Sequence, residues 1–384
     1  MHRALVLARR GEGRTSPNPA VGAVIVKQDR VVGEGFHRRA GATHAEVEAL
    51  RQAGPRARGA TLYATLEPCN HFGRTPPCCD AILAAGIRRV VVAMPDPNPI
   101  TDGRGLRRLA RAGVRVVRGV LEAEARALNE PFLHVMRTGR PLLIAKMGES
   151  LDGKIATARG ESRWITSPAA RRLAHRWRSR VDALLIGIRT VLRDDPRLTV
   201  RGAPQRPGRP IRIIVDSHLR TPPSARCLRS PTLIATTARR PAKAAALSRR
   251  GAEVLCLPAR RGRVPLRLLC RRLAQRGVHS VLLEGGGELL AGALAERLVG
   301  RVVFLIAPIL LGGRTAPSAI GGDGVQRLSR AIRLAEVSVR RVGSEVCVEG
   351  QVVYPEHRDG TPTRRARHGT RAFRSHVSGP KSEG

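Results

Sequence analysis

One histidine and two cysteines near the start of the chain are spaced like the ligands of a metal ion. His44 is followed two residues later by Glu46, Cys69 comes directly after a glutamate and a proline, and Cys78 comes after two prolines. One imidazole and two thiolates supply three of the four ligands of tetrahedral zinc and leave the fourth position open for water. The chain must therefore fold so that these three side chains converge, and the sequence predicts a catalytic metal site.

Glu46 is well placed to move the protons of a zinc-activated water. A histidine-x-glutamate segment followed by a proline–cysteine pair is typical of zinc-dependent base deaminases. An alternative is a closed structural site, in which His71 or Cys79 supplies a fourth ligand. For Cys79 itself, a packing role at the start of a helix is the other interpretation.

The composition indicates a multidomain globular protein. A chain of 384 residues suggests two or three domains, and 42% hydrophobic with only 2% aromatic residues predicts cores of Ala, Val, Leu and Ile. No apolar run approaches the roughly 20 residues of a bilayer span, and the first ten residues lack the apolar region of a signal peptide. Seven cysteines at uneven spacing do not suggest a disulfide framework. We therefore expect a cytoplasmic protein with no membrane partner.

The net charge of +39 is the most unusual bulk property, with 69 Lys and Arg against 30 Asp and Glu. Such a balance is compatible with nucleic-acid binding. The arginines are nevertheless scattered along the chain, and aromatic residues for stacking on bases are few. We expect a compositional bias and no nucleic-acid partner, although the positive field suits a phosphorylated substrate.

Short apolar runs alternate with helical patterns along the chain, which favours sheets covered by helices on both faces. A turn-rich break at residues 138–141 divides the chain, and apolar residues become rare after about residue 355. We therefore predict domains at 1–140 and 141–355, and a basic disordered tail at 356–384. The strands of the first half are expected at 21–27, 31–36, 61–65, 89–93 and 114–117, and its helices at 44–53, 78–85, 105–112 and 122–137. The strands of the second half are expected at 142–147, 183–188, 211–215, 232–236, 280–283, 302–307, 333–339 and 345–353, and its helices at 168–178, 266–275 and 288–298.

Four segments of the first half, at 18–22, 67–69, 73–78 and 96–99, together resemble the deaminase half of the bifunctional riboflavin-biosynthesis deaminase/reductases. The long segment between the two cysteines separates this pattern from the P-C-x-x-C of nucleic-acid and cytidine deaminases. The resemblance implies a cytidine-deaminase-like three-layer α/β/α domain that binds Zn²⁺. It also implies that the substrate is a diaminopyrimidinone carrying a ribosylamino 5-phosphate. The implied substrate-binding residues are Asn18, His37, His71, Arg74, Asp96 and Asn98.

The resemblance continues through 146–156, 162–167, 190–201 and 215–217, which are similar to the family's NADPH-dependent reductase domain, an α/β domain resembling dihydrofolate reductase. It implies cofactor contacts by Gly148, Trp164, Thr190, Asp194, Ser217 and Gly286. It implies substrate contacts by Ser162, Arg178, Leu198, Arg201 and Glu284.

Taken without the resemblance, the clearest element of the second half is a strand followed by Gly285, Gly286 and Gly287 at a helix start. The exposed N–H groups of such a turn suit cofactor phosphates, although a tight structural turn is about as well supported by these residues alone. Leu290 stands where a dinucleotide-binding fingerprint has its third glycine, so a Rossmann domain is not supported.

The sequence thus predicts a riboflavin-biosynthesis enzyme that first deaminates a phosphorylated pyrimidine by zinc-assisted hydrolysis and then reduces its ribosyl group to ribityl with NADPH. One alternative is a base deaminase acting on tRNA with a non-catalytic C-terminal domain. Another is a deaminase whose reductase half is only a scaffold. The sequence assigns no proton donor for the reduction and leaves the oligomeric state open, a homo-oligomer being one alternative.

Overall fold

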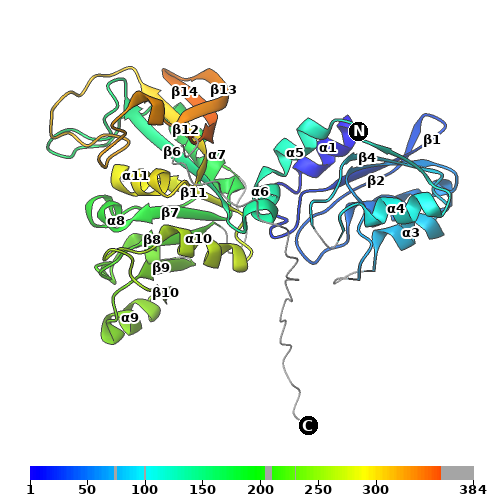
Figure 1. The fold of residues 1–384 in the computed structure, drawn as a ribbon, viewed down its shortest axis with the longest axis horizontal. Coiled ribbons are helices and arrows are strands. Elements are labelled where there is room, and N and C mark those ends of the chain that lie inside the picture. Colours follow the sequence, from blue (N-terminus) through cyan, green and yellow to red (C-terminus); the bar gives the residue numbers. More distant parts are fainter. Residues whose placement is uncertain (73–75, 99–100, 204–209, 230, 356–384) are drawn as a thin grey trace, which may run out of the picture.

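The computed structural model describes residues 1–72, 76–98, 101–203, 210–229 and 231–355, which form two lobes built on separate β-sheets (Figure 1). The tail predicted at 356–384 lies outside the described residues. In the part that is described, no helix has the length and apolar character needed to cross a bilayer.

The sheet of the N-terminal lobe has the strand order β2-β1-β3-β4-β5. Strand β1 is antiparallel to β2 and β3, whereas β3, β4 and β5 run parallel. The hairpin and the three later strands are all near their predicted positions. The bounds are β1 Gly22–Lys27, β2 Arg30–Phe36, β3 Thr61–Leu66, β4 Arg89–Met94 and β5 Arg115–Arg118.

Helices cover both faces of this sheet, so the predicted three-layer α/β/α arrangement is confirmed. On one face lie α2 (Ala45–Ala53), α3 (Cys78–Ala84) and α4 (Arg104–Arg111), and on the other lie α1 (His2–Arg9) and α5 (Glu122–Leu128) (Figure 1). Helix α1 was not predicted.

Two glycines of β2 allow α2 to lie unusually close to the sheet. A Cβ on Gly35 would stand 2.3 Å from the carbonyl oxygen of Ala45, and one on Gly33 would stand 2.2 Å from that of Ala49. This close approach fixes the start of α2, and with it the position of His44.

A single helix predicted over 122–137 is wrong, because the structure has two helices there. Helix α5 ends at Leu128 and α6 (Glu130–Thr138) follows after Asn129. Pro131 explains the break, since proline lacks the N–H that a continuous helix needs and its ring clashes with the preceding turn. Helix α6 lies between the two lobes (Figure 1).

The sheet of the C-terminal lobe has the order β10-β9-β8-β7-β11-β6-β12-β14-β13. The first seven strands in this order run parallel, and β14 and β13 add an antiparallel edge. The short β10 was not predicted. The bounds are β6 Leu142–Ser150, β7 Ala183–Gly187, β8 Ile211–Val215, β9 Thr232–Thr236, β10 Ala252–Cys256, β11 Ser280–Glu284, β12 Val299–Ala307, β13 Arg333–Val342 and β14 Glu345–Val353.

Two apolar cores, one on each face of this sheet, hold its helices. Helices α7 (Pro168–Arg180), α8 (Ile188–Asp194) and α9 (Pro241–Ser248) pack on one face, and α10 (Leu266–Gln275) and α11 (Gly287–Ala295) pack on the other. Helices α8 and α9 were not predicted, because each offers only a short apolar pattern. Single 3₁₀ turns occur at Gly54–Ala57, Arg226–Arg229 and Leu328–Arg330.

The carboxyl ends of β6, β7, β8 and β11 meet at one edge of the parallel part of this sheet. In open α/β sheets this edge is where ligands bind. Many of the cofactor and substrate residues expected in the second half follow these strand ends.

Candidate active sites

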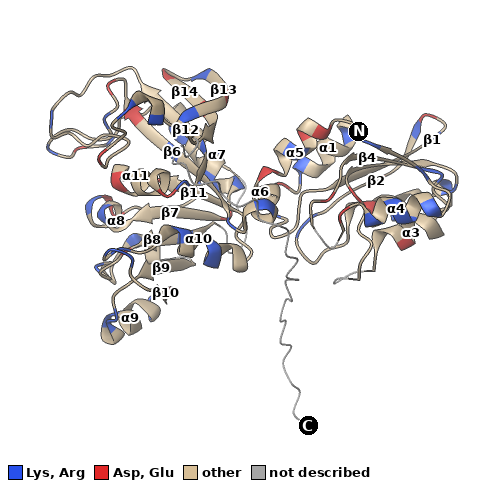
Figure 2. Ribbon diagram, viewed as in Figure 1, with Lys and Arg blue, Asp and Glu red and all other residues tan. Residues whose placement is uncertain are grey.

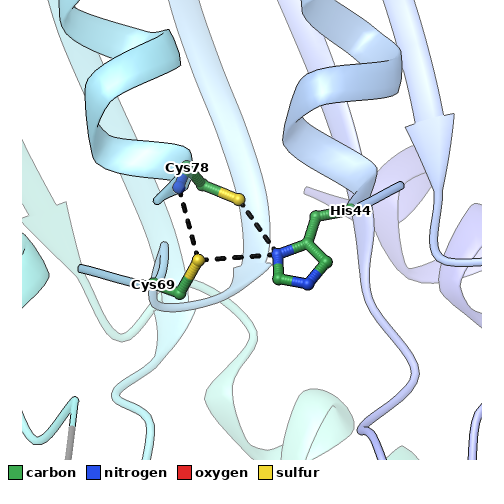
Figure 3. A group of neighbouring side chains, drawn as sticks. All are labelled: His44, Cys69 and Cys78. Carbon is green, nitrogen blue, oxygen red and sulfur yellow. Dashed lines mark hydrogen bonds between the residues drawn. The ribbon is translucent and has the colours of Figure 1, made fainter. Parts of the chain in front are cut away.

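The three predicted metal ligands of the N-terminal lobe converge (Figure 3). His44 immediately precedes α2, Cys78 begins α3, and Cys69 lies in the segment after β3. The imidazole Nδ1 of His44 is 3.1 Å from Cys78 Sγ and 3.5 Å from Cys69 Sγ, and one atom of each residue lies within 4.8 Å of the others.

The charge on the two sulfurs suits a divalent cation. Hydrogen bonding to Cys78 and His44 lowers the pKa of Cys69, which favours the thiolate form of this sulfur. The same contact with Cys69, together with burial, raises the pKa of Cys78. Without a cation, only one of the two sulfurs is readily ionised. A cation bound between both sulfurs and the imidazole allows both to ionise, because coordination stabilises both thiolates.

No fourth protein ligand joins this cluster among the residues that the structure describes. Cys79 points elsewhere, with its Sγ 3.6 Å from the carbonyl oxygen of Pro68 and 3.7 Å from that of Gly105. The described residues therefore favour an open site over the closed structural one, and they give Cys79 a packing role.

Glu46 stands in the first turn of α2, two residues after His44, and is almost fully buried. Burial, the largest cause, raises the pKa of Glu46 to about 7. A carboxyl group with a pKa near neutrality both accepts and returns a proton readily, which is the property required of a general base that later acts as an acid.

Asn18 and His37 lie next to the metal ligands. The Asn18 Nδ2 atom is 3.1 Å from Nε2 of His37, whose Nδ1 is 3.2 Å from the carbonyl oxygen of Thr43. The rings of His37 and His44 meet edge to face, with centroids 5.5 Å apart. Burial lowers the pKa of His37, so its ring is neutral, with Nδ1–H donating to Thr43 and Nε2 accepting from Asn18.

Asp96 and Asn98 follow β4 on the same side of the lobe. The Asp96 carboxylate accepts the backbone N–H of Asn98 at 3.0 Å, and burial raises the pKa of Asp96. Among the described residues, Nδ1 of His71 is buried without a hydrogen-bond partner, as expected of a side chain that completes its contacts with a ligand. Arg74, the sixth expected residue, lies outside the described residues.

Glu67 is a part of this site that the sequence analysis missed. Its buried carboxylate accepts four backbone N–H groups. The donors are Asp96 at 3.2 Å, Gly103 at 3.0 Å, Gly105 at 3.1 Å and Leu106 at 3.3 Å. The resemblance already included Glu67 in the segment 67–69, but its residue type and spacing gave it no role.

The C-terminal lobe holds a buried charge cluster at the sheet edge described above. Arg178 of α7 binds Glu284, at the end of β11, through two atoms, with Nε 2.9 Å from Oε1 and Nη2 2.6 Å from Oε2. Lys146 of β6 is 3.9 Å from the same carboxylate. Burial alone raises the pKa of Glu284, but Arg178 and Lys146 outweigh burial and lower it to about 2. The sequence analysis expected Arg178 and Glu284 as separate substrate contacts and gave Lys146 no role.

Two more expected substrate residues lie beside this cluster. Arg178 also donates to the carbonyl oxygen of Thr199 at 3.0 Å, which follows the buried Leu198. The backbone N–H of Arg201 donates to His175 of α7 at 3.3 Å, and the Arg201 side chain is exposed. Ser162 lies half-buried in the loop before α7.

The glycines after β11 form the turn expected for cofactor phosphates. Gly286 has φ +81° and precedes α11, and a Cβ there would stand 3.7 Å from the hydroxyl of Thr190. Gly287 packs against the backbone at Ser318, since a Cβ would stand 2.4 Å from that carbonyl oxygen. The turn therefore leaves room for a ligand at Gly286 and for close packing at Gly287.

Gly148, Trp164 and Asp194 occur along the neighbouring loops. A Cβ on Gly148 would stand 3.0 Å from the methyl group of Thr166. Trp164 is 67% exposed, with the Arg171 guanidinium 4.4 Å from the centroid of its ring. Arg163 donates to the carbonyl oxygen of Asp194 at 2.7 Å, which joins the Trp164 loop to the end of α8.

Ser217 stands apart from these contacts. Its hydroxyl oxygen accepts the backbone N–H of Val264 at 3.1 Å, and its carbonyl accepts the hydroxyls of Thr236 and Thr237. These hydrogen bonds join Ser217 to the loops after β9 and β10, and not to the other expected cofactor residues.

Two family models match the chain. Residues 1–94 match the cytidine and deoxycytidylate deaminase zinc-binding region, and residues 141–348 match the RibD C-terminal domain. The fold and the three-ligand centre therefore define a zinc-dependent deaminase joined to a reductase domain.

Full-length relatives extend the match. The riboflavin biosynthesis protein RibD of Escherichia coli (strain K12) is 46% identical over 364 residues, covering 91% of this chain and 97% of the relative. RibD of Aquifex aeolicus (strain VF5) is 43% identical, with 91% and 96% covered. This chain belongs to the RibD family, the bifunctional deaminase/reductases of riboflavin biosynthesis, which use zinc in the deaminase domain and NADPH in the reductase domain.

Solved structures agree with this assignment. Form 1 of Acinetobacter baumannii RibD has a TM-score of 0.84 at 39% identity, with 92% of this chain and 97% of that chain covered. A diaminohydroxyphosphoribosylaminopyrimidine deaminase/5-amino-6-(5-phosphoribosylamino)uracil reductase from Thermotoga maritima has a TM-score of 0.80 at 34% identity, with 91% and 97% covered. The predicted family, fold and bifunctional activity are thus confirmed, and a nucleic-acid base deaminase with a non-catalytic second domain is not favoured.

Proposed function

We propose that the N-terminal lobe deaminates diaminohydroxyphosphoribosylaminopyrimidine and that the C-terminal lobe reduces the product, 5-amino-6-(5-phosphoribosylamino)uracil, the two compounds named for the Thermotoga maritima relative. The observation that carries the proposal is the convergence of His44, Cys69 and Cys78 within 4.8 Å, beside the buried Glu46. Three ligands of this kind fit zinc with one position open.

In the deamination, His44, Cys69 and Cys78 hold the metal, and Glu46 is the catalytic proton carrier. Bound zinc supplies an acidified water molecule at neutral pH. Glu46 takes the two protons of the attacking water in turn, passing the first to the ring nitrogen and the second to the departing amine. The water oxygen becomes the ring carbonyl, and the amino group leaves as ammonia.

We assign the pyrimidine and its phosphate to the polar groups around the metal ligands. Neutral His37 and Asn18 form a fixed pair beside His44, and Asp96 offers a buried carboxylate for ring N–H groups. The other assigned substrate residues are His71, Arg74 and Asn98.

In the reduction, the cluster of Arg178, Glu284 and Lys146 positions the phosphorylated substrate. Glu284 is held ionised and immobile by Arg178, so it presents a fixed acceptor for substrate hydroxyl or amine groups. Because Arg178 is already bound to Glu284, the exposed Arg201 is the better phosphate contact. Ser162 and Leu198 complete the assigned substrate contacts.

NADPH, when bound, supplies the hydride that converts the ribosyl group to ribityl. We place its phosphates at the Gly286 turn and its rings along the loop that carries the exposed Trp164. The other assigned cofactor residues are Gly148, Thr190, Asp194 and Ser217.

We further propose domain limits of 1–140 and 141–355, supported by the end of α6 at Thr138 and by the family match that begins at residue 141. The substrate is a small molecule in the cytoplasm and not a nucleic acid. Lys and Arg are spread over both lobes in the view of Figure 2, which supports a general excess of positive charge over a dedicated nucleic-acid face. A homo-oligomer is compatible with this function, and light scattering would distinguish it from a monomer.

The test compares substrates directly. Purified protein is incubated with the free pyrimidine phosphate or with tRNA while ammonia is measured, and NADPH absorbance is followed with the deaminated compound. Ammonia release from the free pyrimidine and oxidation of NADPH are expected. Ammonia release from tRNA alone would contradict the substrate assignment, and an active deaminase without NADPH oxidation would leave the second lobe a scaffold.

A further inference from the structure

We propose that Ser16 and Asp182 are positioning residues for deamination, through which the reductase lobe holds the Asn18 segment of the deaminase site in place. The inference rests on the proposed role of Asn18 in binding the pyrimidine. It adds a contribution of the second lobe to the first reaction.

Asp182 is a buried anchor in the reductase lobe, directly before β7. Its Oδ2 atom accepts hydrogen bonds from the backbone N–H groups of His279 at 2.9 Å and Ser280 at 3.1 Å, and from the Ser280 hydroxyl at 3.1 Å. These donors come from the start of β11, the neighbouring strand. A carboxylate held in this way has no rotational freedom and forms a rigid acceptor.

The fourth donor to the same oxygen comes from the other lobe. The Ser16 hydroxyl donates to Asp182 Oδ2 at 3.0 Å, across 166 positions of sequence. The next residue, Pro17, packs on the reductase lobe as well, since a Cβ on Gly277 would stand 3.5 Å from the ring of Pro17. Two consecutive residues of the deaminase lobe are therefore seated on its neighbour.

The segment that follows Ser16 is fixed at its other end too. The side chain of Asn129 accepts the backbone N–H of Ala20 at 2.8 Å and donates to the carbonyl oxygen of Ala20 at 3.0 Å. Asn18 lies between these two attachments, and its own N–H donates to the carbonyl oxygen of Thr15 at 2.8 Å. Loss of the Ser16 hydrogen bond would leave the Pro17 contact as the remaining attachment of this end of the segment to the reductase lobe.

A connected path then leads to the metal centre. Asn18 Nδ2 contacts Nε2 of His37 at 3.1 Å, and the His37 ring lies against that of His44. A cavity of about 240 Å³ borders this path at the lobe junction, lined among others by Ser16, Asn18, Asn129, Trp177 and Ser280. Because packing there is incomplete, hydrogen bonds rather than close contact set the position of the segment.

The decisive variant is Ser16→Ala in the full-length protein, with deaminase and reductase kinetics measured separately on their own substrates. We expect the deaminase KM to rise about tenfold, the effect of losing a hydrogen bond to a charged acceptor. Deaminase kcat, zinc content and both reductase constants should stay within about twofold of the unmodified protein, because neither the metal ligands nor the reductase site is touched. Ser16→Thr, which keeps the hydroxyl, should restore most of the affinity.

Asp182→Asn tests the same contact from the reductase side. It should also raise the deaminase KM, although the residue is far from the deaminase site in sequence. Ser248→Ala, an exposed serine on α9 of the reductase lobe, is the matched control and should change nothing.

An unchanged deaminase KM in Ser16→Ala would overturn the inference. A joint loss of zinc, deaminase kcat and reductase activity in the same variant would also overturn it, because the contact would then be merely structural. Absence of ammonia release by the unmodified protein would instead contradict the proposed function, and the inference with it. Ser16→Ala keeps the test decisive if Asp182→Asn fails to fold.

Discussion

The carboxylate of Glu67 accepts the backbone N–H of Gly105 at 3.1 Å, which ties the cysteine segment to the first turn of α4. Gly105 must be glycine for this contact, because a Cβ would stand 2.2 Å from the carbonyl oxygen of Pro68. The same carboxylate holds the backbone N–H of Asp96. One buried side chain thus fixes the loop that carries Cys69 relative to the loop that carries the assigned substrate residues.

Replacing Glu67 by Gln should therefore lower both stability and deaminase activity. The amide has one acceptor oxygen in place of two, so at least one pair of buried N–H groups is left unsatisfied, at a cost of ~1–3 kcal/mol for each group. Thermal unfolding and the two separate assays would measure the effect, with reductase activity retained. Glu124→Gln, an exposed glutamate in the first turn of α5, is the control. Equal behaviour of the two variants would contradict the role given to Glu67.

The contrast between His44 and Glu67 shows how much of the site could be predicted from sequence. Ligand chemistry restricts which residue types can hold zinc, so His44, Cys69 and Cys78 were found from type and order alone. Glu67 acts through backbone N–H groups, which every non-proline residue carries and which leave no trace in the sequence.

The same limit applies to the fold. Most strands and the longer helices were predicted because apolar periodicity reports which face is buried. The break at Asn129 was missed although Pro131 marks it, because the apolar pattern continues across the break. The pairing of Ser16 with Asp182 was beyond reach, since it depends on how two lobes dock.

Cys69→Ser should lose zinc, whereas Cys79→Ser should keep it. A serine hydroxyl is a far weaker zinc ligand than a thiolate, and Cys69 is one of three converging ligands. Cys79, next to the ligand Cys78, is a buried cysteine whose Sγ faces carbonyl oxygens instead of the cluster. Metal analysis of the purified variants measures the difference. Full zinc occupancy in Cys69→Ser would refute its role as a ligand.

Glu46→Gln should keep zinc and abolish ammonia release, while reduction of supplied 5-amino-6-(5-phosphoribosylamino)uracil continues. The amide preserves the shape of the side chain but cannot carry the proton, and loss of such a group typically costs a factor of about 10²–10⁴. The control is Glu48→Gln, two residues further along α2. Glu48 pairs with Arg51, and this variant should retain both activities. A parallel fall of both activities in Glu46→Gln would contradict the independence of the two sites.

The ion pair of Glu284 should make the reductase lobe sensitive to acid. The pKa of Glu284 is lowered from 4.5 to about 2 in the folded protein, so its stabilising contribution is full above pH 4.5 and is lost as the pH falls toward 2. The difference in free energy of unfolding between the unmodified protein and Glu284→Gln should shrink over that interval. Denaturation followed by tryptophan fluorescence reports this lobe alone, because both tryptophans, Trp164 and Trp177, lie in it.

Glu253→Gln provides the control for this measurement. Glu253 pairs with Arg276 at 2.6 Å on an exposed edge of the same lobe, where an ion pair contributes only ~0–1 kcal/mol. The change in free energy of unfolding caused by Glu253→Gln should therefore be small at every pH. A difference for Glu284→Gln that stays constant down to about pH 2 would show that the carboxylate is not held ionised by Arg178 and Lys146.

Trp164→Ala should weaken NADPH binding about tenfold, or ~1.4 kcal/mol, which lies within the range for loss of one aromatic stacking partner of a base. Trp164, which is 67% exposed, costs stability unless a ligand covers it, and the Arg171 guanidinium on its ring also attracts phosphate. Titration with NADPH, followed by the cofactor's fluorescence, gives the Kd. The Kd of Trp164→Phe should lie between that of the unmodified protein and that of Trp164→Ala. Val337→Ala, an exposed apolar residue on the edge strand β13, should leave the Kd unchanged. Unaltered NADPH affinity in Trp164→Ala would contradict the assignment of the cofactor rings to this loop. A change in deaminase kinetics would show that the loop acts on both sites.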